Sequence, residues 1–327
     1  MRFATIGSNY ITEWFLTAAA QCDGFTLQAV YSRSAEQAEA NRVRWGAHTA
    51  YADLCALAAD PLVDAVYLAS PNHCHVAQSQ QMLRAGKHVL CEKPIAPDEA
   101  SLASLLATAR EHGVLLLEAM RPAFLPAVEE IRALLPGLGT LRYAEFPYCQ
   151  YSSRYDHVLA GGRENAFDPT LCNGALMDIG VYCVHWMLIL LGEPSDVISR
   201  ASFMPHAIDV SGTALCSYPG FVAQLCYSKV HASLRPCVLE GEKGSLHIRP
   251  FPLPTDATFT PRGGEAQVIS LNTPALDMAL EINAFMRMAA HPGDAAPYQQ
   301  LSLQALRVMD RIRLDNGIDF QRRLHTV

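Results

Sequence analysis

The first third of the chain alternates short apolar runs with segments of helical character. Apolar runs at residues 2–7, 25–32, 64–70, 87–93 and 114–119 predict strands, and the segments between them, at 10–21, 34–45, 75–85 and 97–112, predict helices. This alternation favours right-handed crossovers in a parallel sheet with helices on both faces. Three of the strands are continuous apolar runs, which is typical of strands buried on both sides.

After about residue 120 the pattern changes to strands that follow one another directly. The expected strands lie at residues 140–148, 196–204, 212–218, 221–230, 237–241 and 245–249. Short turns between neighbouring strands predict an antiparallel sheet. The fold class is therefore α/β: a doubly wound parallel sheet over residues 1–120, followed by an α+β domain with a largely antiparallel open sheet over residues 121–327.

One long apolar helix, at residues 174–191, interrupts the second group of strands. Its composition raises the question of a membrane span, but Asp178 and His185 interrupt the run, and it falls short of the usual ~20 apolar residues. We therefore expect a buried core helix and no membrane partner.

Composition narrows the class of protein. Half of the 327 residues are hydrophobic and 17% are charged, as in globular domains. The net charge of −7 argues against nucleic-acid binding, which needs clustered Lys and Arg. Ten cysteines occur without a C-x-x-C pair, so no metal site is expected. No export signal is visible, which predicts a cytoplasmic protein with reduced thiols.

The stretch IGSNYITEW follows the first strand, where dinucleotide-binding enzymes place a glycine-rich phosphate turn. Only Gly7 remains of the three usual glycines, and Asn9 and Thr12 occupy the other two positions. The helix N-terminus still offers N–H groups and a favourable dipole to a phosphate. An ordinary strand–helix turn is the alternative. If the turn binds a dinucleotide, the candidate contacts are Gly7, Ser8, Asn9, Tyr10 and Ile11.

The end of the second strand bears on the choice of cofactor. A site for NAD usually carries an acidic residue there, to bind the ribose 2′-hydroxyl. This chain has Ser32 and Arg33 instead. An arginine can pair with a 2′-phosphate, so NADP is the expected cofactor, with NAD still possible. A solvated arginine at a helix start is the alternative interpretation.

Two further motifs carry a family resemblance. Pro71, Asn72 and His75 form P-N-x-x-H, and residues 86–94 read GKHVLCEKP. Together with CNGALMDIGVYCVHW at 172–186, they closely resemble the Gfo/Idh/MocA oxidoreductases, over residues 1 to about 250. The DIGVYC segment is most similar to the branch of dihydrodiol dehydrogenases and glucose-fructose oxidoreductases, which have Tyr where inositol dehydrogenases have His.

The resemblance implies a fold and an activity. The first domain would be an NAD(P)-binding Rossmann domain, and the second would bind substrate and form a homodimer or homotetramer through its sheet. The reaction would move a hydride between nicotinamide and a secondary alcohol or ketone. The substrate would be a sugar, a cyclic polyol or a dihydrodiol.

The resemblance also implies catalytic roles for Lys93, Asp178 and Tyr182. Lys93 ends a parallel strand, where it can stabilise charge on a reacting oxygen. A phenol with its ordinary pKa of about 10 is a weak base at neutral pH, and a nearby lysine would make Tyr182 a usable acid or base. Asp178 and Tyr182 are four residues apart, so an α-helix would place both on one face. The remaining cofactor-side candidates are Ser70, Pro71, Asn72, His75, Glu92 and Lys93 itself.

Structural alternatives remain open for several residues. Tyr182 can be a buried tyrosine bonded to backbone, His185 is expected to be a core histidine, and Arg121 either approaches substrate or forms a structural ion pair.

The competing functions are a dinucleotide-binding regulator without turnover and a glycosidase that uses bound NAD as a transient hydride store. A regulator does not need the Lys93–Tyr182 pair, and the glycine-poor turn argues against a tightly held cofactor. Substrate contacts are expected from residues 146–170, which do not identify a molecule.

Overall fold

A computed structural model describes residues 1–204 and 208–320 of the chain. The chain divides into two compact units, Met1–Phe124 with Ala275–Leu303, and Leu125–Pro274 with the segment that begins at Gln304. The first junction lies close to the predicted division at residues 120 and 121. Residues 275–303, which the sequence pattern places in the second domain, group with the first unit.

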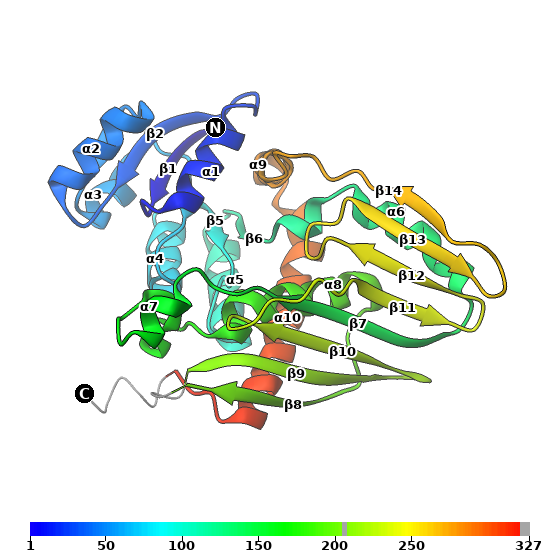
Figure 1. Ribbon diagram of the computed structural model, residues 1–327. Coiled ribbons are helices and arrows are strands. Elements are labelled where there is room, and N and C mark those ends of the chain that lie inside the picture. Colours follow the sequence, from blue (N-terminus) through cyan, green and yellow to red (C-terminus); the bar gives the residue numbers. More distant parts are fainter. Residues whose placement is uncertain (205–207, 321–327) are drawn as a thin grey trace. The chain divides into compact units, whose positions relative to one another are not determined.

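The first unit contains a six-stranded sheet whose strands are all parallel (Figure 1). The strand order is β3-β2-β1-β4-β5-β6. The strands are β1 (Arg2–Ile6), β2 (Thr26–Tyr31), β3 (Thr49–Tyr51), β4 (Ala65–Leu68), β5 (His88–Glu92) and β6 (Leu116–Ala119). The helices are α1 (Tyr10–Ala19), α2 (Ala35–Trp45), α3 (Leu54–Ala59), α4 (Asn72–Arg84), α5 (Glu99–Glu111), η1 (Arg121–Phe124), α9 (Met278–Ala290) and η7 (Pro292–Ala295). The predicted doubly wound parallel sheet is confirmed.

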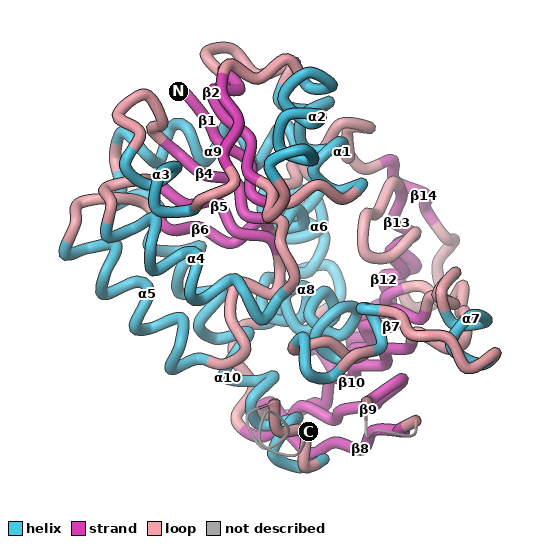
Figure 2. The backbone as a smooth tube through the Cα atoms, turned by 90° about the vertical axis from the view of Figure 1, so that its left-hand side faces the viewer, coloured by secondary structure: helices cyan, strands magenta, loops and turns pink. Residues whose placement is uncertain are grey.

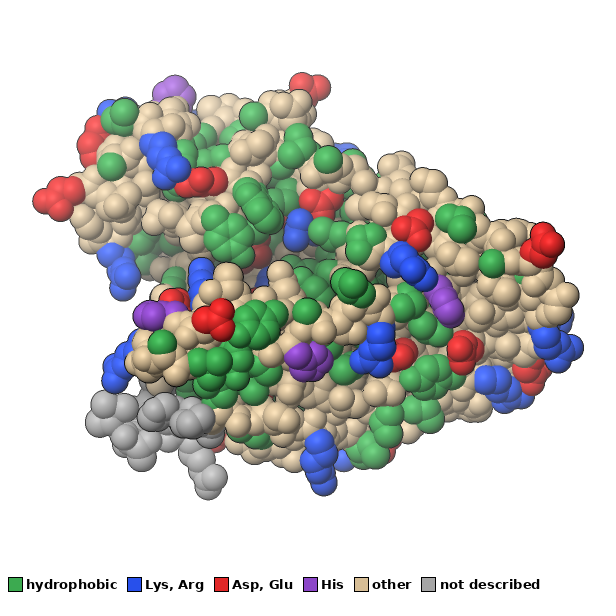
Figure 3. All heavy atoms as spheres, in the orientation of Figure 1, with side chains coloured by type: hydrophobic (Ala, Val, Ile, Leu, Met, Phe, Trp, Pro, Cys, Tyr) green, Lys and Arg blue, Asp and Glu red, His purple; other side chains and the backbone are tan. Residues whose placement is uncertain are grey.

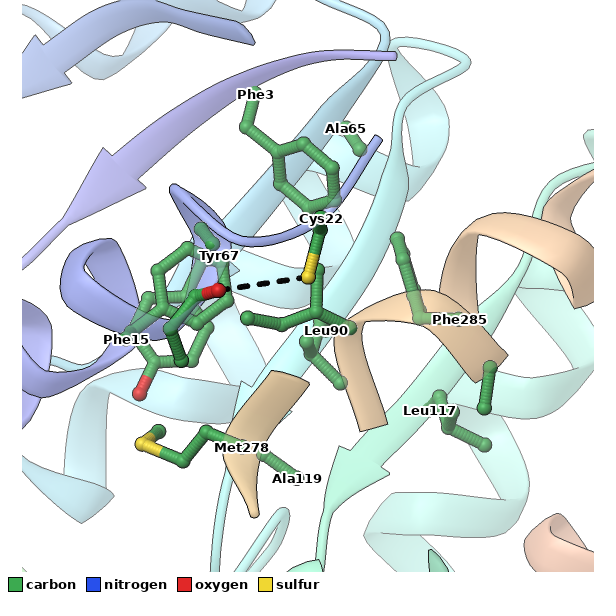
Figure 4. Packing of buried hydrophobic residues seen from close by; sticks show 14 of the residues in the cluster. Phe3, Phe15, Cys22, Ala65, Tyr67, Leu90, Leu117, Ala119, Met278 and Phe285 are labelled. Carbon is green, nitrogen blue, oxygen red and sulfur yellow. Dashed lines mark hydrogen bonds between the residues drawn. The ribbon is translucent and has the colours of Figure 1, made fainter. Parts of the chain in front are cut away.

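Helices cover both faces of this sheet, and three of them begin at a side chain that caps the helix. Asn9, Ser34 and Asp98 cap α1, α2 and α5 with side-chain oxygens that accept from backbone N–H groups. Figure 2 shows α4 and α5 running beside each other along the sheet. On the side of α1, the ring of Tyr67 stacks on Phe15 with 3.7 Å between centroids (Figure 4).

Helix α9 completes that core, although it lies far along the sequence. Met278 and Phe285 are buried against the α1 side of the sheet, and the Phe285 ring lies 5.7 Å from that of Phe3. The first unit is therefore built from two separate segments of chain. The pattern of the first third could not show this, nor the short elements β3 and α3.

The second unit contains an eight-stranded sheet in the order β14-β13-β12-β11-β7-β10-β9-β8. Its strands are β7 (Leu141–Cys149), β8 (Asp196–Phe203), β9 (Asp209–Tyr218), β10 (Phe221–Ser228), β11 (Cys237–Gly241), β12 (Gly244–Arg249), β13 (Asp256–Pro261) and β14 (Gln267–Ser270). Every neighbouring pair is antiparallel except β7 and β10, which are parallel. The largely antiparallel sheet is confirmed; β13 and β14 extend it beyond the predicted strands.

Helices of the second unit are mostly short. They are α6 (Ala127–Leu134), η2 (Leu135–Leu138), α7 (Tyr155–Leu159), η3 (Asn165–Phe167), η4 (Pro169–Leu171), η5 (Leu176–Gly180) and α8 (Val181–Leu191). A last helix, α10 (Ala296–Asn316), begins in the first unit and ends in the second.

The long helix predicted at 174–191 is not uniformly α-helical. Its first turn, η5, is a π-helix, and the α-helical part, α8, starts only at Val181. Among the described residues, Pro169–Leu191 is long and apolar enough to cross a membrane by length and composition. However, 89% of its most apolar window is buried inside the fold, as expected of a core helix.

Candidate active site

Four predicted segments meet at one edge of the parallel sheet. The strand order reverses between β1 and β4, and open α/β sheets bind ligands outside the carboxyl ends of the strands at such a point. Gly7 follows β1, Arg33 follows β2, Ser70 follows β4 and Lys93 follows β5. The structure therefore brings the predicted dinucleotide-binding segments together.

The turn after β1 requires a glycine. Gly7 has a φ of +121°, and a Cβ atom there would lie 2.5 Å from the Ala69 carbonyl oxygen. The Asn9 carboxamide closes the same turn, because its Nδ2 donates to that oxygen at 3.0 Å. Its Oδ1 accepts from the N–H groups of Ile11 and Thr12, at 3.1 and 3.2 Å. A phosphate at this helix would thus use the N–H groups before Ile11 or displace the Asn9 side chain.

His75 links the ends of β4 and β5. Its ring is fully buried, with Nδ1 2.9 Å from the Pro94 carbonyl oxygen and Nε2 2.9 Å from that of Ser70. Two carbonyl acceptors favour a doubly protonated ring, but burial is the larger effect and lowers the pKa of His75. His75 therefore fixes the backbone beside Lys93.

Glu92 lies beneath the same segment. The Tyr67 hydroxyl donates to Glu92 Oε1 at 2.6 Å, and the Lys93 backbone N–H donates to Oε2 at 3.3 Å. Burial raises the pKa of Glu92, although Tyr67, Lys93 and Arg121 act in the opposite direction. Glu92 is thus a fixed acceptor for the backbone that carries Lys93. The Lys93 side chain is partly exposed, and the peptide bond to Pro94 is cis.

Behind these residues lies an acidic group that the sequence analysis did not identify. Glu281 of α9 is fully buried, and its pKa is raised well above the usual range by burial and by the charges of Glu92 and Asp277. Arg121 lies 3.2 Å from both carboxylate oxygens of Asp277, and both side chains are largely buried. Arg121 therefore forms the structural ion pair that was one of its two interpretations.

The other two catalytic candidates lie in the second unit, on the segment formed by η5 and α8. Within residues 174–189, every residue is buried except Asp178 and Tyr182. Asp178 lies in the π-helical turn, so the α-helical spacing assumed for the pair does not apply unchanged. Tyr182 packs edge-on against Tyr148, with 5.7 Å between ring centroids. Asp178 and Tyr182 are nevertheless the two residues of this apolar segment whose side chains are accessible.

Neighbouring strands anchor this segment with two charged residues that the sequence analysis missed. Asp209 Oδ2 accepts from the Leu176 N–H at 2.7 Å, at the start of η5. A Cβ atom at Gly174 would lie 1.9 Å from Asp209 Oδ1, so this position accommodates only glycine. Lys229 Nζ lies 3.0 Å from Asp178 Oδ2. Both residues are charged groups within apolar runs, and that signal could have revealed them.

Asp209 gives a pH dependence that can be measured. Burial raises its pKa to about 6, whereas an aspartate in an unfolded chain titrates at about 4. Between these values the folded chain holds a proton that the unfolded chain has released, so the free energy of unfolding rises as the pH falls. When the pH is lowered from about 7.5 to about 5, we expect the free energy of unfolding to rise by about 1 kcal/mol more in the wild type than in Asp209→Asn. Denaturant unfolding at the two pH values measures this difference. If the free energy of unfolding depends on pH in the same way in both proteins, the pKa of Asp209 is not raised by burial.

No group of three or more His, Cys, Asp or Glu side chains that could hold a metal ion occurs within residues 1–204 and 208–320.

Comparison with known families gives two matches. Residues 1–120 match the profile of an oxidoreductase family with an NAD-binding Rossmann fold, and residues 136–247 match the GFO/IDH/MocA C-terminal domain. Together the two matches cover most of the chain.

Individual relatives extend over nearly the whole chain. The chain is 39% identical to scyllo-inositol 2-dehydrogenase (NADP(+)) IolU of Bacillus subtilis, over 97% of this chain and 98% of the relative. It is 28% identical to the trans-1,2-dihydrobenzene-1,2-diol dehydrogenase of Mus musculus, over 78% and 77% of the two chains. Among solved structures, it is similar to KijD10, a 3-ketoreductase from Actinomadura kijaniata in complex with NADP and TDP-benzene. The TM-score is 0.87, with 25% identity over 97% and 98% of the chains.

Proposed function

The chain belongs to the Gfo/Idh/MocA family of NAD(P)-binding oxidoreductases, and we propose that it is an NADP-dependent dehydrogenase of a cyclic polyol, sugar or dihydrodiol. The observation that carries this proposal is the meeting of Gly7, Arg33, Ser70 and Lys93 at the strand-order reversal of the sheet. The relatives named as acting on scyllo-inositol and dihydrobenzenediol support the class of substrate.

The residues at this edge fit a dinucleotide. The missing side chain at Gly7 lets the turn lie directly against the Ala69 backbone, and α1 begins directly after the turn. Arg33 is exposed at the end of β2, where it can pair with a 2′-phosphate. The segments 7–11, 32–33 and 70–72 would hold the cofactor, which supplies the hydride acceptor or donor when bound.

The protein's own groups manage the proton and the charge on the substrate oxygen. We assign Lys93 to hydrogen-bond that oxygen and stabilise negative charge on it, and Tyr182 to exchange its proton. Asp178, accessible on the same segment as Tyr182, binds a neighbouring hydroxyl of the substrate. Asp178 and Tyr182 are the two side chains that their otherwise buried segment leaves accessible.

A dehydrogenase screen tests the proposal. Inositols, aldoses and cyclic trans-diols are supplied with NADP or NAD, and reduced nicotinamide is followed by absorbance. We expect NADP-dependent turnover of at least one cyclic polyol or diol. Saturable binding of NADPH without turnover of any class would instead favour the dinucleotide-binding regulator.

Cofactor preference depends on Arg33. Loss of a charge-assisted hydrogen bond costs about 1.5–3 kcal/mol, so Arg33→Ala is expected to weaken NADPH binding by about 10- to 100-fold and to leave NADH nearly unchanged. Fluorescence titration with both cofactors measures this. Arg42→Ala is the control, because Arg42 pairs with Glu39 on the surface of α2. An equal loss for NADPH and NADH would show that Arg33 does not bind the 2′-phosphate.

We further propose a cytoplasmic homo-oligomer. Cys22, Cys91 and Cys237 are buried free thiols, as expected in a reducing compartment. Exposed apolar side chains gather on one face of the second sheet, at Ile198, Leu215 and Val222 of adjacent strands. Such a face suits a second copy of the chain.

Figure 3 shows acidic and basic side chains interspersed on the face that it displays, which supports a small-molecule rather than a nucleic-acid partner. Sedimentation equilibrium tests the proposed homo-oligomer, and cell fractionation tests the proposed cytoplasmic location.

A further inference from the structure

Lys229 is a buried cation at the end of β10. Its side chain is only 2% exposed, which is rare for lysine unless the charge is paired. The ammonium group lies 3.0 Å from Asp178 Oδ2, donates to the Ala166 carbonyl oxygen at 2.5 Å and lies 4.8 Å from the centroid of the Phe167 ring. One cation thus holds together η5 and the loop around η3.

The backbone of Lys229 is fixed as well. Its N–H donates to the Val210 carbonyl oxygen at 2.9 Å, and its own carbonyl accepts from the Ser152 N–H at 2.8 Å. These bonds tie it to β9 and to the segment that follows β7. The position from which the ammonium group reaches Asp178 is therefore set by the sheet.

The two members of the ion pair differ in exposure. The Asp178 side chain is 38% exposed, against 2% for Lys229. The ammonium group therefore binds the carboxylate from the interior of the fold, and the carboxylate is accessible to solvent. The accessible carboxylate can therefore contact a ligand while its cationic partner stays in the interior. Asp209 is a second acid near the same cation: burial raises its pKa to about 6, and Lys229 counteracts this.

From these contacts we propose that Lys229 is a positioning residue for substrate recognition. It fixes the orientation of Asp178 and the path of residues 165–167, so that the Asp178 carboxylate is presented to a hydroxyl group of the substrate. The inference rests on the proposed function, since it assigns part of the substrate site. It adds a residue that the motifs do not include and that contacts Ala166 and Phe167, within the segment from which substrate contacts are expected.

The test is a double-mutant cycle with kinetics for a substrate found in the screen. Lys229→Met should lower kcat/KM by about 10²-fold, because a small misplacement of a binding group costs about that factor. NADPH affinity should change less than about twofold. In an Asp178→Asn background, the same replacement should cost less than about threefold, because the group that it positions is already altered. Lys229→Arg, which keeps the charge, should recover part of the activity.

Two controls separate this role from general destabilisation. Lys87→Met removes another buried lysine, whose Nζ donates to the carbonyl oxygens of Asp60 and Val63, and should lower stability without changing substrate kcat/KM. If Lys229→Met does not fold, Asp178→Asn is compared with the double variant, in which the Asp178 carboxylate and its cation are removed together. A loss of more than about tenfold between these two would overturn the inference, as would equal losses in both backgrounds. If the wild type turns over no substrate, it is the proposed function that fails.

Discussion

Lys93→Met is expected to lower the rate of the dehydrogenase reaction by about 10²–10⁴-fold while NADPH affinity changes far less. Lys93 directly follows β5 at the carboxyl edge of the sheet, on backbone fixed by Glu92 and by His75 through Pro94. A cation carried on fixed backbone stabilises charge on a substrate oxygen at a lower reorganisation cost than one on a mobile loop. Methionine keeps the length and apolar stem of the side chain but removes the charge.

Tyr182→Phe should fall in the same range, and the two effects should not multiply. If Lys93 and Tyr182 act on one substrate oxygen, removing either destroys the unit, so the double variant should be little worse than the poorer single variant. Single-turnover rates with saturating NADP measure this directly. Multiplicative losses would show two independent roles. A near-normal Tyr182→Phe would assign proton transfer to another residue.

Most of the first unit could be predicted, because its strands are long apolar runs separated by helical segments. β3 and α3 were missed because three and six residues are too few to establish a period. The return of α9 to this unit depends on the packing of Met278 and Phe285 against Phe15 and its neighbours, and such long-range contacts leave no mark in the local pattern.

The part of the candidate site that lies in recognisable motifs could be predicted from the sequence. Gly7, Arg33 and Lys93 stand at strand ends, and strand ends are visible in the sequence. The π-helical turn at Asp178 was not predicted, because π-helices are rare and the long-range contacts that anchor this one are not visible in the local sequence. Here the anchors are Asp209 and Lys229, from strands 31 and 51 residues further along the chain. Their charges within apolar runs were the available signal.

Gly7→Ala should be the most disruptive single replacement at the phosphate turn. The added Cβ atom would lie 2.5 Å from the Ala69 carbonyl oxygen and 2.7 Å from its carbon, and both belong to backbone that follows β4. Backbone at the end of a buried strand cannot move aside as a flexible side chain can. The φ of +121° adds strain for any residue with a side chain. Strain of about 1–3 kcal/mol and a forced backbone shift of about 1–3 kcal/mol together predict a loss of about 2–6 kcal/mol in the free energy of unfolding.

Gly24→Ala is the matched control for this change. Gly24 lies in the same unit and also has a positive φ, +80°, but a Cβ atom there would meet nothing within 4 Å. It should therefore lose only the conformational term, about 1–2 kcal/mol. Denaturant unfolding of both variants separates strain from collision, and NADPH titration of the folded Gly7→Ala fraction should show binding weakened by at least about tenfold, because the turn must open to admit the methyl group. If the two variants unfold at the same denaturant concentration, the close approach of the β1 and β4 ends does not constrain this turn, and the phosphate site must be formed by other backbone groups.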